Sequence, residues 1–344
     1  MQKTVAKINL DGLRRNAQTF MDLAGVPLIA VVKANAYGHG AEETVCALQG
    51  IAHGFAVCLL EEGLSVKTAA CGKDILVFTP PTDENQALLM MKNAFLMTVS
   101  DIKSARLIDG VCKRVRLPAR VHLKCNTGMN RYGMLLPALG KACKLLRENP
   151  WIHVEGLYSH LYAHDEETAN AQRIRFLAAQ ELCKWYFPHI LSHLSATYGC
   201  LLGQPFAFDA VRVGLGLYGY LPDDVPAERL PLQKVMQVYA RCVDERQYSS
   251  GGAGYTNFVP NGVHRLRTVR YGYADGSPWL CTREERLSTC MDACVCIGDT
   301  KRLKGSVLPV MTDARESASY HQTTCYEILC RASARAEYVY GYYR

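Results

Sequence analysis

Eight short apolar runs recur between residues 27 and 220, and amphipathic segments separate them. Several runs are β-branched and carry apolar side chains at successive positions, which is typical of parallel strands buried on both faces. The segments between them carry apolar residues at helical spacing. This alternation predicts a (β/α)8 barrel, because a doubly wound open sheet more often has about five or six strands. The predicted strands span residues 27–36, 54–60, 74–80, 94–100, 119–125, 152–161, 190–196 and 211–219.

The pattern changes after residue 222. Residues 221–231 are rich in proline and acidic residues and are typical of a linker. The following segments have weak helical periodicity and frequent turn residues, which indicates a second, mainly β domain. They span residues 234–246, 264–276, 286–299 and 306–314. We therefore predict a barrel domain of residues 1–222 and a C-terminal β domain of residues 223–344, with residues 1–10 pairing with the second domain.

The composition excludes several classes of protein. The 344 residues carry a net charge of +7, and basic side chains are interleaved with acidic ones, whereas a nucleic-acid-binding stripe would be concentrated. No apolar stretch approaches the ~18 residues of a membrane span, and the first residues lack the apolar core of a signal peptide. We expect a soluble, cytoplasmic protein that has no nucleic-acid partner and no membrane segment.

The 15 cysteines form no C-x-x-C pair. The tightest group, Cys290, Cys294 and Cys296, has no histidine cluster beside it to complete a tetrahedral zinc site. The sequence favours small, buried cysteines in a reducing compartment, and we expect no metal site.

Active sites of (β/α)8 barrels lie at the carboxyl ends of the strands. The predicted strand ends carry Lys33, Lys124, His160, His193 and Arg212. Barrel geometry would bring these ionisable side chains together although they are far apart in the sequence.

Lys33 lies in the string AVVKANAYGHG, residues 30–40. An unpaired ammonium is costly to bury, and burial lowers the pKa of a lysine, which makes it a nucleophile able to form a Schiff base. A strand-end lysine whose stem packs while its ammonium reaches water is the structural alternative.

This string is similar to the cofactor-lysine motif of alanine racemases, V-x-K-A-(N/D)-A-Y-G-H-G, and it resembles less fully the related non-enzymatic pyridoxal-phosphate-binding proteins. The string LKCNTGMNRYGM, residues 123–134, resembles a second racemase motif. The resemblance implies pyridoxal 5'-phosphate on Lys33 in a fold-type III enzyme. It also implies that Arg131 contacts the cofactor and the substrate carboxylate, and that Lys124 is a candidate for carbamylation.

The resemblance extends to SHLSATYG, AVRVGLGLYGY and the C-terminal TTCYEILCRASARAEYVY. It implies that Arg212 faces the pyridine nitrogen and that His160 positions this arginine. A guanidinium cannot accept a proton, so it would leave that nitrogen unprotonated and make the ring a weaker electron sink. The residues assigned by resemblance to the cofactor phosphate are Tyr37, Thr197, Gly214, Leu215 and Tyr326.

Racemisation needs a proton removed from one face of Cα and returned to the other. In the family the second base is a tyrosine from the partner subunit, and the candidate is Tyr255 in GAGYTNFVP, where Thr256 replaces the usual glycine. GYADG and CMDAC resemble racemase strings that place Tyr273 at the active-site entrance and the Met291 backbone at the substrate carboxylate. We therefore expect a homodimer with shared active sites and a small amino acid as substrate.

Three functions are compatible with a barrel that carries the cofactor-lysine motif. The first is interconversion of L- and D-alanine, which in the family supplies cell-wall peptidoglycan, with serine or broad specificity as a variant; Tyr326 favours alanine. The second is a non-catalytic pyridoxal-phosphate-binding protein, but those proteins lack a β domain. The third is a barrel decarboxylase, which places a glutamate where Arg212 stands.

Overall fold

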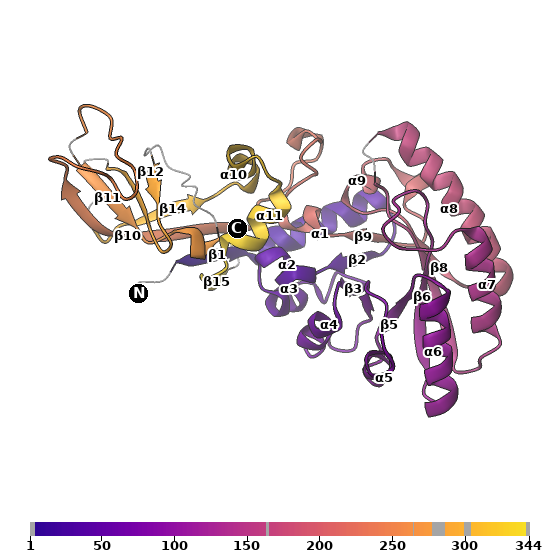
Figure 1. Ribbon diagram of the computed structural model, residues 1–344. Coiled ribbons are helices and arrows are strands. Elements are labelled where there is room, and N and C mark those ends of the chain that lie inside the picture. The colour runs from indigo at the N-terminus through magenta and orange to yellow at the C-terminus, as the bar shows by residue number, and fades with distance from the viewer. Residues whose placement is uncertain (1–3, 163–164, 264, 277–285, 299–303, 342–344) are drawn as a thin grey trace.

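The computed structural model describes residues 4–162, 165–263, 265–276, 286–298 and 304–341. A barrel wrapped in helices lies at one end of an elongated molecule, and a β sheet extends from it at the other end (Figure 1). The predicted architecture, a (β/α)8 barrel with a mainly β C-terminal domain, is confirmed.

Eight parallel strands form the barrel in the order β9-β2-β3-β4-β5-β6-β7-β8. Backbone hydrogen bonds from Asp209 N to Ser192 O and from Arg212 N to Ser195 O, both 2.9 Å long, join the two end strands. All eight lie within the predicted apolar runs. Their bounds are β2 (Leu28–Val31), β3 (Gly54–Val57), β4 (Ile75–Val77), β5 (Leu96–Val99), β6 (Ala119–Lys124), β7 (Ile152–Tyr158), β8 (Leu191–His193) and β9 (Val211–Val213).

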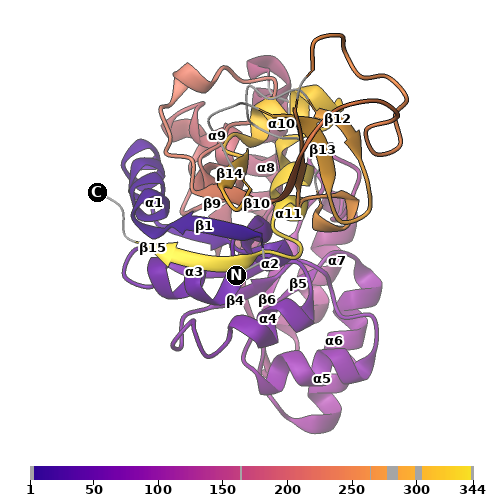
Figure 2. The same cartoon turned by 90° about the vertical axis from the view of Figure 1, so that its left-hand side faces the viewer.

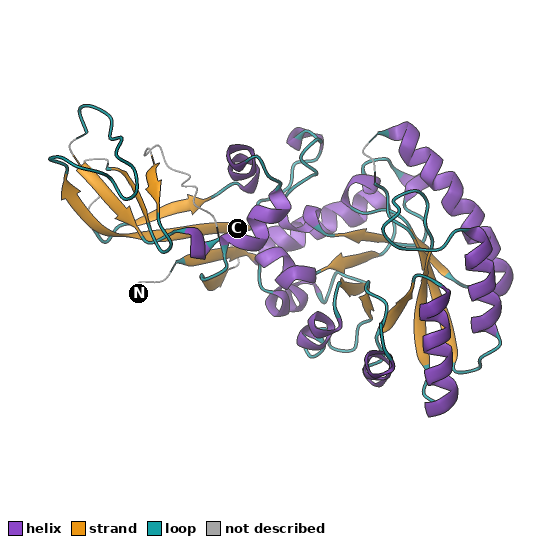
Figure 3. Ribbon diagram, viewed as in Figure 1, coloured by secondary structure: helices purple, strands orange, loops and turns teal. Residues whose placement is uncertain are grey.

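Helices cover the outside of the barrel (Figure 3). Their apolar faces pack on the strands, and side-chain caps fix several starts, as at Asp101, whose carboxylate accepts from Ser104 N. The barrel helices are α1 (Leu10–Ala24), α2 (Lys33–Gly38), α3 (Ala41–Leu48), α4 (Leu60–Val66), α5 (Glu84–Lys92), α6 (Ile102–Val115), α7 (Leu136–Arg147), α8 (Glu166–Tyr186) and α9 (Thr197–Cys200), with the 3-10 turns η1 (Gln204–Phe206) and η2 (Leu215–Tyr218).

The second sheet has the order β12-β13-β11-β10-β1-β15, and β14 pairs with β10. The run 286–299 splits into two strands, because Cys290 N bonds Ala293 O and turns the chain back. The strands are β1 (Val5–Asn9), β10 (Met236–Gln247), β11 (Arg265–Val269), β12 (Arg286–Thr289), β13 (Cys294–Ile297), β14 (Val307–Met311) and β15 (Glu337–Gly341).

Strand β1 ties the sheet to the barrel, because it runs directly into α1. It pairs antiparallel with β10 and parallel with the last strand, β15 (Figure 2). The Asn9 side chain accepts from Gly12 N at 2.9 Å and so caps α1 at the junction. The first and last strands of the described chain are therefore held side by side in the second sheet.

Two further helices, α10 (Ala314–His321) and α11 (Cys325–Ala332), were not expected from the sequence. They pack on each other, and α11 contacts α2, which carries Lys33. Within the described ranges, no helix combines the length and apolarity of a membrane span. No cluster of histidine, cysteine or acidic side chains in the same ranges could hold a metal ion.

A glycine substitution tests the junction between barrel and linker. Gly219 has φ 95°, and a Cβ there would strike the Gln233 carbonyl oxygen. We expect Gly219→Ala to lower the free energy of unfolding by about 2 kcal/mol or more. Gly110→Ala is the control, because Gly110 lies exposed within α6 with open space around it. That variant should gain roughly 0.5–1 kcal/mol. Denaturant unfolding measures the free energy of unfolding of both variants. Equal values for Gly219→Ala and Gly110→Ala would contradict the prediction.

Candidate active site

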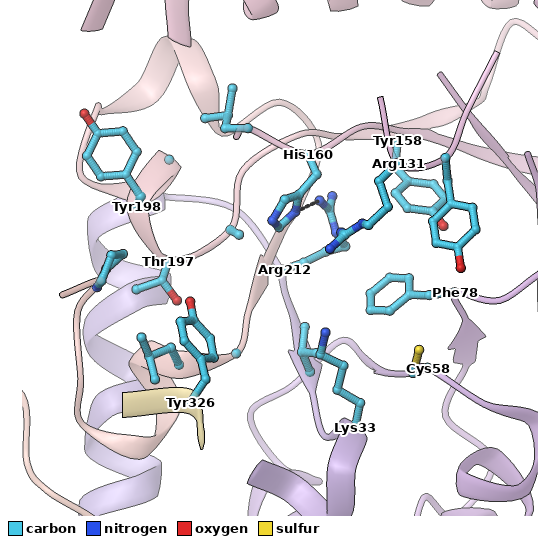
Figure 4. Close-up of a pocket in the computed structure, with 18 of the residues that line it drawn as sticks. Lys33, Cys58, Phe78, Arg131, Tyr158, His160, Thr197, Tyr198, Arg212 and Tyr326 are labelled. Atoms are coloured by element: carbon cyan, nitrogen blue, oxygen red, sulfur yellow. Dashed lines mark hydrogen bonds between the residues drawn. The ribbon is translucent and has the colours of Figure 1, made fainter. Parts of the chain in front are cut away.

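A cavity of about 510 Å³ opens at the carboxyl ends of the barrel strands. Figure 4 shows side chains from several strand ends converging on it. Residues from all parts of the barrel and from α11 line this cavity, including ten that the sequence singled out. These are Lys33, Tyr37, Lys124, Arg131, His160, Thr197, Arg212, Gly214, Leu215 and Tyr326.

Lys33 begins α2, two residues beyond the end of β2, and its side chain reaches into the cavity. It is half-buried, so it does not lie within an apolar strand as the sequence suggested. The next four residues, 34–37, have φ of 52–53° and ψ of 41–50°. This is one left-handed turn built without glycine, which L-residues adopt at a cost of roughly 1–2 kcal/mol each.

Polar side chains hold the left-handed turn. Glu62 Oε1 accepts from Ala34 N at 2.7 Å, and the Asn35 side chain accepts from Ala41 N at 2.9 Å. His39 Nδ1 lies 3.0 Å and 2.9 Å from the carbonyl oxygens of Ala36 and Tyr37, so it must carry the proton. Burial lowers the pKa of His39 to about 4, so the ring stays neutral.

The C-terminal segment holds the far end of the same turn. Ser333 Oγ donates to Gly38 O at 2.7 Å, and Tyr338 Oη donates to the same oxygen at 3.0 Å. Asn35 Nδ2 in turn donates to Tyr338 Oη at 3.3 Å. We call Ser333 and Tyr338 the C-terminal clamp.

Arg212 is the most deeply buried cation in the cavity wall, with 2% of its surface exposed. Its NH1 donates to His193 Nδ1 and to His193 O, both at 2.8 Å. Its NH2 donates to Ser159 O at 2.6 Å and to Leu194 O at 3.0 Å. Among the described residues, the remaining N–H, on Nε, has no hydrogen-bond partner. Burial lowers the pKa of Arg212 to about 10, so it stays charged at neutral pH.

Lys124 ends β6 and is 8% exposed. Its Nζ lies 4.2 Å from the centroid of the Tyr158 ring. Burial, and then the charge of Arg212, hold the pKa of Lys124 well below its usual range. A neutral amine is therefore favoured here. Arg131 lies exposed at the cavity wall, and in the described parts of the chain it makes no hydrogen bond or ion pair.

His160 faces Arg212 across the cavity, with Nδ1 3.5 Å from NH2, which is the contact dashed in Figure 4. Burial, and then the Arg212 charge, place the pKa of His160 well below its ordinary value. The imidazole is therefore neutral and available as an acceptor.

Hydroxyl groups and the backbone of Gly214 and Leu215 lie together at the other end of the cavity. Thr197 Oγ1 accepts from Gly216 N at 3.1 Å. The Tyr37 hydroxyl lies against Gly214, where a Cβ would come within 2.5 Å of it. Leu215 begins η2, so its N–H has no helical partner. This end is suited to an anion such as a phosphate.

Comparison with known proteins gives the same assignment throughout. Residues 8–222 match the family described as "Alanine racemase, N-terminal domain". The chain belongs to the alanine racemase family. A relative named alanine racemase from Aromatoleum aromaticum is 34% identical over 285 residues, covering 81% of this chain and 78% of the relative. An alanine racemase from Clostridium perfringens is 29% identical over 374 residues, with 97% and 94% coverage.

Solved structures of alanine racemases share the whole architecture. The biosynthetic alanine racemase from Pseudomonas aeruginosa superposes with a TM-score of 0.88 at 26% identity, covering 99% of this chain and 100% of that one. The alanine racemase of Clostridium difficile 630 gives a TM-score of 0.87 at 25% identity, with 99% and 96% coverage. The likeness therefore includes the β domain.

Three residues that the sequence assigned to the alanine racemase site lie elsewhere in this chain. Tyr255, Tyr273 and Met291 line a separate hollow on the β domain, with exposed fractions of 86%, 60% and 64%. Figure 1 places this domain at the opposite end of the molecule from the barrel. One chain therefore presents two separate sets of family residues.

Sequence reasoning missed Tyr158 and the C-terminal clamp. Tyr158 lies under both Lys124 and Arg212, whose guanidinium is 5.3 Å from the ring centroid. It lies two residues before His160, so strand alternation could have placed it on the same inner face. No local sequence pattern identifies Ser333 or Tyr338, because their partner Gly38 is about 300 residues away.

The clamp can be tested by removing its hydroxyls. We expect Ser333→Ala with Tyr338→Phe to leave the Gly38 carbonyl oxygen without either donor, which costs about 1–3 kcal/mol. The amides of Ala36, His39 and Gly40, which bond within and beside the turn, should then exchange faster with solvent. Hydrogen exchange measures this. Tyr239→Phe, which removes a hydroxyl bonded to Gln237, is the control. Unchanged exchange in the double variant would contradict the role of the clamp.

Proposed function

We propose that this chain interconverts L- and D-alanine with pyridoxal 5'-phosphate held by Lys33. The observation that carries the proposal is the presence in one cavity of Lys33 and a buried Arg212 that, among the described residues, has a single unused N–H. The alanine racemases among its relatives make alanine the substrate that the proposal names. Supply of D-alanine for peptidoglycan is the use that the family implies.

The residues present fit the cofactor at each of its functional groups. The unused Nε–H of Arg212 is a donor for a ring nitrogen. Thr197, Tyr37, Tyr326 and the backbone around Gly214 suit the phosphate, and Lys33 is the amine for the aldehyde. When bound, pyridoxal phosphate supplies an electron-withdrawing ring that weakens the Cα–H bond of an attached amino acid.

Arg212 limits how strong that electron withdrawal is. Its pKa of about 10 keeps it charged at neutral pH, and a guanidinium can offer the ring nitrogen a hydrogen bond but cannot accept a proton. Arg212 would thus leave the ring nitrogen of a bound cofactor unprotonated, which would favour return of a proton to Cα over competing reactions. This argues against a decarboxylase, which would place a carboxylate here.

Lys33 can hold or release a proton on one face of Cα, and Tyr255 would act on the other. Because Tyr255 lies on the β domain, far from the cavity of its own chain, it would have to come from a second copy. The exposed side chains of Tyr255, Tyr273 and Met291 line one hollow, and exposed apolar side chains gathered in this way are typical of an interface. We therefore propose a homodimer in which each cavity is completed by the partner.

Arg131 would hold the substrate carboxylate, because its guanidinium is exposed at the cavity wall and has a planar fork of donors. Lys124 is proposed to carry a carbamate. Its lowered pKa leaves a neutral amine, which can add to carbon dioxide and lose one N–H proton to solvent, and the resulting carbamate anion would pair with Arg131.

Loss of Lys33 tests the cofactor assignment. Protein incubated with pyridoxal phosphate and then freed of unbound cofactor should absorb in the near-visible range and convert L-alanine to D-alanine. Lys33→Ala should abolish both, because no other amine at that position can hold the cofactor. Lys92→Ala, a change at an exposed lysine of α5, should alter neither. Colourless wild-type protein would overturn the proposal, and faster conversion of L-serine would reassign the substrate to serine.

Mixing two inactive variants tests the shared site. Lys33→Ala and Tyr255→Phe chains each lack one base, but a mixed dimer would contain one cavity with both bases. Co-refolded or co-expressed variants should regain up to about a quarter of wild-type activity per subunit if pairing is random. Two samples of one variant, treated the same way, are the control. If light scattering shows that the mixed sample contains dimers but no activity returns, the shared site is contradicted.

A further inference from the structure

Two buried histidines extend the hydrogen bonds of Arg212 into the barrel interior. His193 Nδ1 accepts from Arg212 NH1 at 2.8 Å, and His193 Nε2 lies 3.0 Å from His122 Nδ1. Both rings are buried, with 0% and 4% of their surfaces exposed for His193 and His122. The cavity is lined by Arg212, but neither histidine lines it.

The donor and acceptor of each of these hydrogen bonds follow from the chemistry of Arg212. A guanidinium can only donate, so His193 Nδ1 must be an unprotonated acceptor. The proton of the neutral His193 ring is then on Nε2, which donates to His122 Nδ1. His122 must therefore accept at Nδ1 and carry its own proton on Nε2. One buried arginine thus determines the tautomers of two histidines.

The local structure is built around these two rings. Strand β7 has an irregularity opposite His122 that brings Gly156 into register with it. A Cβ at Gly156 would come within 2.5 Å of the His122 ring, so only glycine leaves room for it. The His193 ring stacks on Tyr158 at 5.1 Å with planes 3° apart, and Tyr158 Oη bonds Thr98 Oγ1 at 2.7 Å.

The surroundings keep both rings neutral. Burial is the largest cause, and it lowers the pKa of His122 to about 3 and that of His193 well below its usual value. The charge of Arg212 also lowers the pKa of both histidines. Arg120 further lowers the pKa of His122, and Lys124 further lowers the pKa of His193. The Asp74 carboxylate opposes this at His122 but is itself paired with Arg120.

We infer that His122 is a positioning residue for Arg212, acting through His193. By accepting from Nε2 of His193, it holds that ring with Nδ1 turned to Arg212 and prevents a ring flip. Arg212, which lines the cavity, then keeps Nε–H as the one donor without a partner in the described parts of the chain. The effect on cofactor binding rests on the proposed function. The tautomeric states of His122 and His193 can be measured without it.

Nuclear magnetic resonance of the purified chain without cofactor reads the tautomers directly. In long-range proton–nitrogen spectra of protein labelled at its 10 histidines, both rings should show the neutral form with the proton on Nε2. Neither should titrate between about pH 5 and pH 8. His122→Asn and His193→Asn spectra assign the signals. A proton on Nδ1 of either ring, or titration near the usual pKa, would overturn the inference.

Two substitutions at His122 separate packing from hydrogen bonding. His122→Phe keeps the ring but removes the acceptor, whereas His122→Asn loses the ring but keeps an oxygen close to the place of Nδ1. We expect His122→Phe to weaken pyridoxal phosphate binding roughly tenfold and to shift the absorbance of the bound cofactor. His122→Asn should retain the wild-type absorbance.

The outcomes of the substitutions are decisive in both directions. An Asn variant more impaired than the Phe variant, or a Phe variant that binds and absorbs like wild type, would show a packing role and overturn the inference. If the Phe variant does not fold, the wild-type tautomers decide. If wild-type protein binds no pyridoxal phosphate, the proposed function fails while the tautomer spectra still test the chain of hydrogen bonds.

Discussion

The burial of one guanidinium constrains the whole carboxyl end of the barrel. A charge removed from water is costly unless its hydrogen bonds are satisfied, and Arg212 achieves this with acceptors that follow β7 and β8. Strands β7, β8 and β9 must therefore end at the same level along the barrel axis. The same geometry closes the barrel, because Arg212 N bonds Ser195 O beyond β8. Fold and site chemistry thus depend on the same contacts.

The left-handed turn after Lys33 shows how strain at a site is balanced. Four residues in this conformation cost roughly 4–8 kcal/mol. Six hydrogen bonds from Glu62, Asn35, His39, Ser333 and Tyr338 are worth roughly 3–9 kcal/mol together. The two ranges are comparable, so the turn persists only while its distant partners stay in place. The lysine is therefore coupled to the C-terminal segment.

Much of this could be predicted from the sequence, because the period of apolar residues depends on local packing. All eight barrel strands and the convergence of Lys33, Lys124, His160 and Arg212 follow from that period and from barrel geometry. The left-handed turn could not be predicted, because its four residues are not glycine and no local pattern marks the conformation. The clamp could not be predicted, because its contacts join residues about 300 positions apart. Helices α10 and α11 were missed since their apolar faces are short and are set by packing on each other and on α2.

The distance between the two sets of family residues has a structural cause. Strand β10 runs for 12 residues, pairing first with β1 beside the barrel and then with β11 farther out. The sheet that it organises holds Tyr255, Tyr273 and Met291 around one hollow, which is separate from the cavity of their own chain. In the proposed homodimer, these residues would meet the cavity of the partner. The same sheet that anchors both chain ends would then align the second base with Lys33 of the partner.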